Sequence, residues 1–415
     1  MRLEVLLRVA INRLCTSGPQ TGIGHYTAQL LRGLYATGAV EIDEVPQGWV
    51  WRLHGLGRRL RALTERRRGS PRVEPGGTPG EAPSRLSWAQ RIVGWLRRRG
   101  QRFLYRHIQS IFARRGLDLY HEPNNVPLPC DLPTVATVHD LSVLLHPEWH
   151  PADRVAHFER EFLSGVGRCA HLLTVSEFVR GEIIATLGVP PDRVSVTYNG
   201  MRAGLRPLPA AEVAAGRLRL GLPPNYLLYL GTLEPRKNVL MLLRVYCSLP
   251  DSLRSRYPLI LVGGWGWNTA ELADYYHDEA RHRGVRHLGY VADAELPMLY
   301  NGARALLFPS FYEGYGLPPV EMLACGGAVI ASTAGAIVEL AGVAAHLIDP
   351  CDEDGWRRAL LRVTADDDWW RRLRRHATEA AAPYTWERCA ADTLAVYRQV
   401  LSLPPAMPQP PRLAA

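Results

Sequence analysis

The densest group of residues that could do chemistry is the stretch E-G-Y-G-L-P-P-V-E, which Glu313 and Glu321 enclose. Its two glycines allow backbone amides to approach a ligand closely, and its paired prolines are typical of the first turn of a helix. A helix that begins after a strand stabilises phosphate charge at its N-terminus. We expect Glu321 in that first turn and Glu313 in the loop, where both could accept hydrogen bonds from vicinal hydroxyls. As an isolated pair they would more often be a helix-dipole partner and a solvated loop residue.

Two adjacent cations, Arg236 and Lys237, form a second group. They follow an apolar run and a turn at Gly231, and a helix is expected from about Val239. A guanidinium fork and a compact ammonium at the end of a strand could neutralise a diphosphate leaving group. Lys237 is the only lysine in the chain, which favours a specific need for an ammonium there, although chance and a plain surface location are the alternatives.

A third and a fourth signal lie in the first half of the chain. His139 directly follows the apolar run Thr134–Val138, so its imidazole could hydrogen-bond a sugar, or it could be a polar strand-end residue. Gly22 and Gly24 form a glycine turn that opens a helix. This turn is not a dinucleotide fingerprint, because Thr27 occupies the third glycine position, but it could approach phosphate or an acceptor.

The acidic run Asp366–Asp368 invites a metal interpretation. We favour helix N-capping, because these acids precede a helical pattern and no His or Glu lies nearby. The seven cysteines include no CxxC spacing. The sequence therefore predicts no metal site.

These residues need parallel sheets to position them. Short apolar runs alternate with helical stretches in both halves of the chain, a pattern that predicts two doubly wound α/β domains. Such sheets bind ligands at the carboxyl ends of their strands. The expected strands are Leu3–Val9, Leu117–Tyr120, Thr134–Val138, Leu172–Val175 and Val194–Thr197, then Tyr226–Leu230, Leu259–Val262, Ala305–Phe308, Ala328–Ala331 and Ala345–Ile348.

Positive charge is concentrated in one segment. The 415 residues carry a net charge of +9, but residues 51–116 alone contain 17 arginines and three glutamates, which leaves the remainder acidic. Residues 51–106 either make peripheral contact with an anionic membrane surface or form a solvated insertion. Nucleic-acid binding is not expected, because we find no helix-turn-helix and no aromatic stacking positions. Without an apolar span or a signal peptide, the sequence predicts a cytoplasmic protein, with the inner face of the membrane as a second location.

Taken together, the motifs resemble the GT4 family of retaining glycosyltransferases, whose GT-B fold has two Rossmann-like domains and an interdomain cleft. The resemblance runs from Gly22 to about Tyr397 and weakens in the arginine-rich insertion. Besides the two glutamates separated by seven residues, it rests on G-I-G-H-Y at Gly22, T-V-H-D-L-S at Thr137, T-V-S-E-F at Thr174, Y-N-G at Tyr198, G-T-L-E-P-R-K-N at Gly231 and V-G-G-W-G-W at Val262. One departure is His25, where the family commonly has Arg.

The resemblance implies a retaining transfer without a metal or another cofactor, and it implies roles for the motif residues. His139 and Glu313 would act at the reacting sugar, and Gly22 and Gly24 would close over phosphate or acceptor. Arg236 and Lys237 would hold the donor diphosphate and Glu321 the ribose. The implied donor-binding set is completed by Gly231, Tyr315, Gly316 and Leu317.

The substrates are implied by a narrower likeness. H-D-L-S together with H-P-E-W-H-P, at residues 146–151, is most similar to mannosyltransferases of bacterial surface polysaccharides. This implies GDP-mannose as donor and a polysaccharide or lipid-linked glycan as acceptor. The alternatives are a nucleotide-sugar 2-epimerase of the same fold and a catalytically silent scaffold.

We expect the first domain to bind the acceptor and the second to bind the donor. The expected domains are residues 1–203, with an insertion at 51–116, and residues 222–385, separated by a short helix and linker. A helix at 386–401 would cross back onto the first domain, as in GT-B relatives. A proline-rich tail at 402–415 is expected to be disordered.

Overall fold

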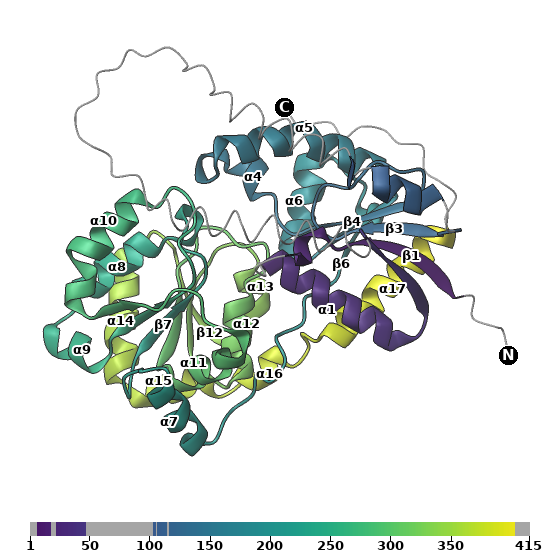
Figure 1. Cartoon of the computed structure of the whole chain (residues 1–415). Helices are drawn as coiled ribbons and strands as arrows, with labels where there is room; N and C mark the ends of the chain where they lie inside the picture. Colours follow the sequence, from purple (N-terminus) through teal and green to yellow (C-terminus); the bar gives the residue numbers. More distant parts are fainter. Residues whose placement is uncertain (1–5, 18–21, 47–102, 105, 114–115, 403–415) are drawn as a thin grey trace, which may run out of the picture.

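The computed structural model describes residues 6–17, 22–46, 103–104, 106–113 and 116–402. They form two lobes side by side, each built around a six-stranded parallel sheet (Figure 1). Most of the arginine-rich insertion and nearly all of the expected tail lie outside the described residues. The choice between membrane contact and a solvated insertion therefore stays open. None of the described helices is both long enough and apolar enough to cross a membrane.

The first sheet has the order β2-β1-β3-β4-β5-β6. Its strands are β1 (Leu7–Asn12), β2 (Val40–Val45), β3 (Leu119–Glu122), β4 (Thr134–Val138), β5 (His171–Thr174) and β6 (Val194–Val196). β1 was expected at Leu3–Val9, but it begins at Leu7 and extends to Asn12, whose side chain thereby reaches the carboxyl edge of the sheet. This shift brings Asn12 level with the end of β3, because Ile11 pairs with His121.

The second sheet has the order β12-β11-β10-β7-β8-β9. Its strands are β7 (Leu227–Leu230), β8 (Leu259–Val262), β9 (Val285–His287), β10 (Ala305–Phe308), β11 (Val329–Ser332) and β12 (Ala345–Ile348). The interior strands β8 and β10 are buried along their whole length, as both-face coverage by helices requires. Parallel pairing brings the carboxyl ends of all these strands to one edge.

Helices connect the strands and cover both sheets. The first lobe contains α1 (Gly22–Thr37), α4 (Ser142–Leu145), α5 (Ala152–Arg168), α6 (Glu177–Leu187) and α17 (Trp386–Ser402). The linker contains α7 (Ala210–Arg219). The second lobe contains α8 (Val239–Cys247), α9 (Asp251–Arg256), α10 (Ala270–Asp278), α11 (Leu296–Gly302), α12 (Leu317–Ala324), α13 (Ile337–Ala341), α14 (Glu353–Ala365), α15 (Asp367–Arg374) and α16 (Ala377–Ala381).

Two local predictions about helices are confirmed. α8 begins at Val239, as the sequence indicated. Asp366 is the N-cap of α15, and its carboxylate accepts a hydrogen bond from the Trp369 amide at 2.8 Å. The acidic run at this point therefore starts a helix, which is a common use of aspartate.

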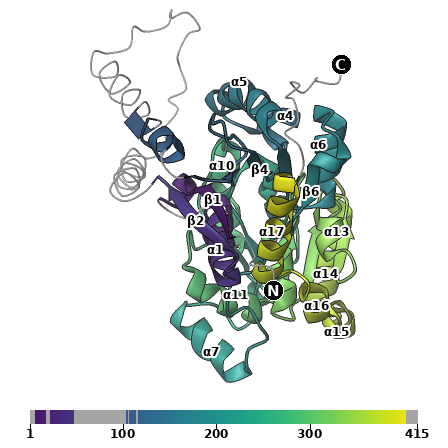
Figure 2. The ribbon, with the colours of Figure 1, turned by 90° about the vertical axis from the view of Figure 1, so that its right-hand side faces the viewer.

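The last helix of the chain returns to the first lobe. Figures 1 and 2 both show α17 beside α1, and a short connection joins it to α16 in the second lobe. The two helices approach closely at Gly33, where a Cβ atom would lie 2.8 Å from the Cβ of Ala390. Trp386, Tyr397 and Val400 of α17 are buried in the same core as β1 and α1.

Candidate active site

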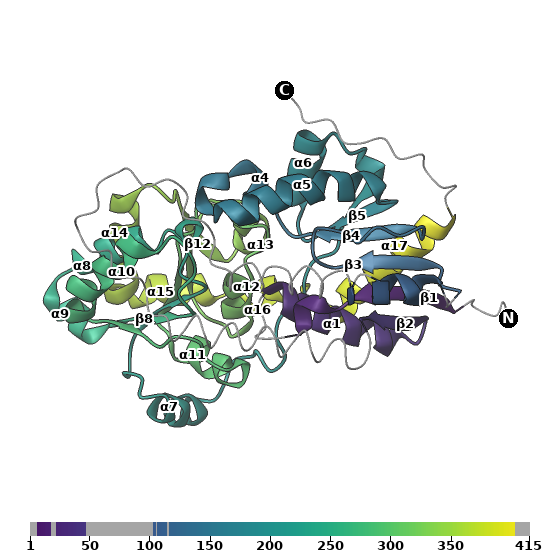
Figure 3. The same ribbon diagram turned by 45° about the horizontal axis from the view of Figure 1, so that its top comes forward.

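A cleft of about 1920 Å³ lies between the two lobes. Its walls include the carboxyl ends of strands from both sheets, which is where doubly wound folds bind ligands. All of the predicted site residues line it except Gly24 and Glu321: those present are Gly22, His139, Gly231, Arg236, Lys237, Glu313, Tyr315, Gly316 and Leu317. Figure 3 shows α4 at the end of the first lobe that faces the second. Just after α4, the Trp149 carbonyl accepts a hydrogen bond from Trp267 Nε1 at 2.7 Å.

The two cations meet one acid from a distant segment. A 3₁₀ turn at Pro235–Lys237 follows β7 and aims both side chains toward the loop after β10. Lys237 Nζ donates to Glu313 Oε1 at 2.6 Å, and Arg236 Nη1 donates to Glu313 Oε2 at 3.3 Å. The structure thus brings together three residues that the sequence singled out separately.

Glu313 is a buried carboxylate held in its ionised form. Burial by itself would raise its pKa, but the charges of Lys237 and Arg236 outweigh burial and lower the pKa. Ser310 Oγ adds a further hydrogen bond to Oε1 at 2.6 Å. Arg236 is also nearly buried, and although burial opposes its charge, Glu313, Asp140 and Glu234 raise its pKa. The site therefore carries fixed charges of both signs at neutral pH.

The glycines of the loop allow the second lobe to touch the first. A Cβ at Gly314 would lie 2.1 Å from the His139 carbonyl oxygen, so no other residue fits there without movement. Gly316 is the N-cap of α12 with a φ of 104°, a left-handed conformation that favours glycine. Since the next residues, Pro318 and Pro319, carry no N–H, the amides of Gly316 and Leu317 are the donors that this helix start offers to the cleft.

Glu321 differs from the prediction in its position and surroundings. α12 begins at Leu317, so Glu321 lies in the second turn and not the first. Its carboxylate is fully buried, and both oxygens accept hydrogen bonds from Arg202 Nη1, at 2.6 and 2.7 Å. Tyr300 donates a third bond at 2.8 Å. Burial raises the pKa of Glu321 in spite of Arg202. Arg202 lines the cleft, whereas Glu321 does not. A contact between Glu321 and the ribose therefore stays a prediction. It would require Arg202 to share this carboxylate with the ribose or to move away from it.

His139 is fixed at the end of β4 as a neutral imidazole. Its Nε2 donates to the Pro123 carbonyl at 2.8 Å, and its backbone amide donates to Asn125 Oδ1 at 3.0 Å. The ring of Tyr26 packs edge-on against the imidazole, with centroids 4.8 Å apart. Burial lowers the pKa of His139. Its unprotonated Nδ1 can therefore accept a hydrogen bond from a sugar hydroxyl while the residue carries no charge.

The glycine turn begins α1 as expected, although its two glycines differ in location. Gly22 lines the cleft, whereas Gly24 is buried within the helix. The neighbouring His25 is buried, and its pKa is lowered to about 4 by burial and then by the charge of Arg202. An arginine at position 25 would place a second cation near Arg202. A neutral His25 avoids that repulsion.

The partners of Glu321 and two polar residues in the first lobe were not among the predicted site residues. Arg202 follows the Y-N-G motif closely, but nothing marked it as a partner of α12. Asn12 and Glu122 also line the cleft. Their signal was available, since both stand at the carboxyl ends of strands, but β1 was expected to end before Asn12 and β3 before Glu122.

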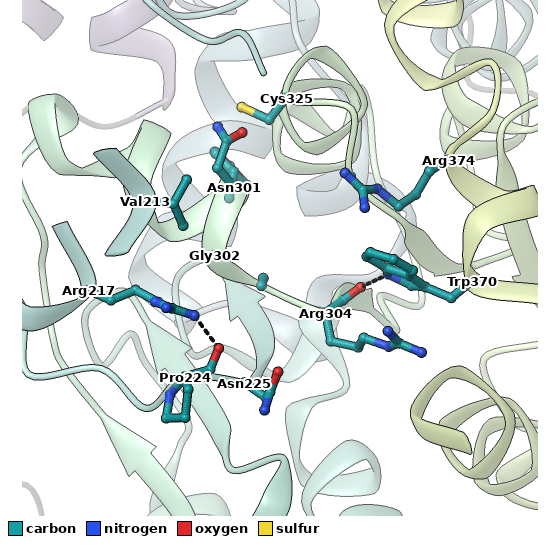
Figure 4. Close-up of a pocket in the computed structure, with 13 residues that line it drawn as sticks. Val213, Arg217, Pro224, Asn225, Asn301, Gly302, Arg304, Cys325, Trp370 and Arg374 are labelled. Carbon is teal, nitrogen blue, oxygen red and sulfur yellow. Dashed lines mark hydrogen bonds between the residues drawn. The ribbon is translucent and has the colours of Figure 1, made fainter. Parts of the chain in front are cut away.

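A second, smaller pocket of about 220 Å³ contains none of the predicted site residues. Figure 4 shows Arg304 and Arg374 on either side of Trp370, with guanidinium carbons 4.3 and 4.2 Å from the ring centroid. Arg304 donates to the Val363 carbonyl and to Asp367, and Arg374 donates to the Gly326 carbonyl. These contacts hold α15 against the rest of the lobe, and we assign the pocket no ligand.

No group of three or more His, Cys, Asp or Glu side chains suited to a metal ion occurs in the described part of the chain. Transfer without a metal stays a prediction.

Comparisons with known proteins agree with this geometry. Residues 215–382 match the family model "Glycosyl transferases group 1", and residues 48–203 match "Glycosyltransferase Family 4". The chain is 35% identical over 388 residues to O-antigen chain mannosyltransferase B of Escherichia coli, covering 92% of this chain and 96% of that protein. Sucrose-phosphate synthase from Thermosynechococcus elongatus superposes with a TM-score of 0.69 at 19% identity, covering 95% of this chain and 99% of the other. Anabaena Alr3699/HepE in complex with UDP and glucose superposes with a TM-score of 0.65 at 18% identity, covering 94% and 100%. Two parallel sheets bound a cleft that is lined by Arg236, Lys237 and Glu313. Together with the two family models and the likeness to the mannosyltransferase, this shows that the chain is a glycosyltransferase of family 4 with the GT-B fold.

Proposed function

We propose that this glycosyltransferase moves mannose from GDP-mannose to a polysaccharide or lipid-linked glycan, with retention of the anomeric configuration. The observation that carries the proposal is the meeting of Arg236, Lys237 and Glu313 in a cleft bounded by both lobes. Fixed cations at the end of a strand stabilise the charge that develops when a nucleotide diphosphate leaves.

The proposed donor follows from the likeness to O-antigen chain mannosyltransferase B, which extends over nearly the whole of both chains. The neighbour HepE, described with UDP and glucose, supports a nucleotide-sugar in a cleft of this kind. The proposed donor position is beside the amides of Gly316 and Leu317, with the diphosphate at Arg236 and Lys237. The acceptor would then enter from the first lobe, where His139 and Glu122 line the same cleft.

A donor panel tests this function. Purified protein is incubated with GDP-mannose, GDP-fucose, UDP-glucose, UDP-galactose and UDP-N-acetylglucosamine, with and without a mannose-terminated acceptor, and released nucleotide diphosphate is measured. We expect release from GDP-mannose above all others, and an α-linked product by NMR. Release from a UDP-sugar alone would contradict the donor, and a β-linkage would contradict retention. Interconversion of sugars would indicate an epimerase, and nucleotide binding without turnover would indicate a scaffold.

A further inference from the structure

A second carboxylate lines the cleft on the side of the first lobe. Glu122 is the last residue of β3, and the residue is 2% exposed. The strand order β1-β3-β4 places it between Asn12, at the end of β1, and His139, just after β4. It therefore stands at the centre of the carboxyl edge of the sheet that faces the donor-binding lobe.

Among the residues that the structure describes, only neutral donors bind Glu122. Tyr120 OH and Asn12 Nδ2 donate to Oε2 at 2.6 and 2.7 Å, and the Asn124 amide donates to Oε1 at 3.0 Å. Glu313 and Glu321 are each paired with cations, whereas Glu122 forms no ion pair with any residue in the described ranges. A buried carboxylate without a cation is costly, and such groups concentrate at functional sites. Oε1 accepts one described hydrogen bond and has a second lone pair.

A short series of contacts connects this carboxylate with the donor-binding cations. The carbonyl of Pro123, the residue after Glu122, accepts the bond from His139 Nε2. The His139 carbonyl packs directly against Gly314. Gly314 follows Glu313, which holds Lys237 at 2.6 Å. Glu122 thus lies on the acceptor side of the place where the sugar and diphosphate would meet.

We infer that Glu122 binds the attacking hydroxyl of the acceptor glycan through Oε1 and accepts its proton. This inference rests on the proposed glycosyl transfer. The hydroxyl oxygen bonds to the anomeric carbon on the same face from which the diphosphate departs, as retention requires, while the bond from that carbon to the diphosphate breaks and its electron pair leaves on the diphosphate. The proton of the hydroxyl passes to the Glu122 carboxylate, so charge and atoms balance without a further reactant.

The titratable groups around Glu122 do not compete with it near neutral pH. Burial raises the pKa of Glu122 to about 7, even though Tyr120, Asn12 and the Asn124 amide each lower it. Tyr120 has a pKa raised well above its ordinary value by burial. Burial raises the pKa of the Cys169 thiol, which also interacts with Glu122, to about 12. Burial lowers the pKa of His139, at the end of β4. A base with a pKa near the working pH is well matched to proton transfer.

The test compares Glu122→Gln with Glu182→Gln. Glu182 in α6 is a matched control, because burial also raises its pKa to about 7 but it accepts its hydrogen bond from Tyr312 and does not line the cleft. Transfer from GDP-mannose is measured against acceptor concentration and pH. We expect Glu122→Gln to lower kcat/KM for the acceptor by roughly 100-fold or more and to remove an ionisation near pH 7. GDP binding should stay within about twofold, and Glu182→Gln should keep the ionisation.

Tyr120→Phe supplies a second variant if Glu122→Gln does not fold. Loss of the Tyr120 hydrogen bond should raise the pKa of Glu122 and move the ionisation in kcat/KM to higher pH. An unchanged acceptor kcat/KM in Glu122→Gln, or an unmoved ionisation in Tyr120→Phe, would overturn the inference while wild-type transfer stands. A wild-type protein that consumes no donor would contradict both the proposed glycosyl transfer and the proton transfer to Glu122.

Discussion

At the scale of single residues, the two cations of the site are neutralised by a carboxylate of the same chain, and a bound donor would change this balance of charge. Glu313 holds Lys237 and Arg236 in place in the free protein, and a diphosphate would bring further anionic oxygens to the same two cations. The positions of the cations are therefore set before the substrate arrives. Preorganised charge of this kind accelerates departure of the leaving group because no reorganisation is needed during reaction.

Replacing Lys237 should affect turnover far more than folding. In Lys237→Ala, Glu313 keeps Arg236 and Ser310, so we expect the unfolding free energy to fall by about 1–3 kcal/mol. Turnover should fall roughly 100- to 1000-fold, because one stabilising charge is lost at the diphosphate. Denaturant unfolding and nucleotide release measure the two effects. Arg219→Ala, which removes an exposed partner of Glu295, should leave turnover unchanged. Loss of folding with an unchanged rate per folded molecule would contradict the role of Lys237.

Glu122 should also leave a signature in stability that is independent of activity. Its pKa in the folded protein, about 7, is above its ordinary value of 4.5, so the folded state binds the proton more tightly in this window. Stability from this group is full below pH 4.5 and is lost as pH rises to about 7. Glu122→Gln removes that loss. The unfolding free energy of the variant relative to wild type should therefore rise by about 3 kcal/mol between pH 4.5 and 8. Parallel stability curves would show that the carboxyl does not titrate in this range.

At the scale of elements, α12 depends on a contact from the linker. Arg202 follows the last strand of the first sheet in the sequence, and its Nη1 donates hydrogen bonds to both carboxylate oxygens of Glu321 in α12. Arg202→Met would remove the cation from a buried carboxylate and leave it the Tyr300 hydroxyl and the backbone of residue 202 as partners, which should lower the unfolding free energy by about 3–5 kcal/mol. Urea unfolding measures the change. Arg206→Met, at an exposed linker position, should cost less than about 0.5 kcal/mol. Equal losses in the two variants would contradict a structural role of the buried pair.

The sequence predicted all the interior strands of both sheets but only two of the four edge strands, β6 and β12. Leu259–Val262 and Ala305–Phe308 are continuous apolar runs because helices cover both sides of their sheet, and both became strands as expected. β2 at Val40–Val45 and β9 at Val285–His287 were not predicted. Each is an edge strand with exposed or half-buried positions, so each needs fewer apolar residues and has a weaker pattern.

One part of the candidate site could also be predicted from the sequence, and another part could not. Arg236, Lys237 and Glu313 were predictable as a group because each follows a parallel strand of one sheet, and parallel strands end at a common edge. The surroundings of Glu321 were not predictable, because Arg202 lies 119 residues before it and the contact depends on the path of the linker. Spacing along the chain carries no information about such a path.

At the scale of the whole molecule, polar contacts hold the two lobes together around the cleft. Glu339 in α13 accepts hydrogen bonds from the Glu177 and Phe178 amides at the start of α6, at 2.9 and 3.1 Å. Tyr312 donates to Glu182 in the same helix, and its oxygen accepts from the Leu141 amide. Ser176 Oγ donates to the Gly314 carbonyl at 2.7 Å. The loop that holds Glu313 is thus braced by the opposite lobe.

A methyl group at Gly314 should separate the lobes at this point. In Gly314→Ala the new Cβ would meet the His139 carbonyl oxygen at 2.1 Å, so the backbones must move apart. We expect kcat/KM for the donor to fall roughly 10-fold or more and the radius of gyration from small-angle X-ray scattering to increase. Gly181→Ala in α6 is the matched control, because its Cβ would meet no atom within 4 Å. A fully active Gly314→Ala would show that the lobes tolerate this separation.

The return of α17 to α1 has a practical consequence for anyone producing parts of this enzyme. A recombinant fragment that stops before Trp386 would lack the helix whose Tyr397 hydroxyl hydrogen-bonds His121 Nδ1 at 2.6 Å, and would expose apolar surface of β1 and α1 to water. Such a fragment should aggregate, and a synthetic peptide spanning residues 386–402 should rescue its solubility. The amino-terminal lobe is therefore one folding unit encoded in two separated pieces of the gene.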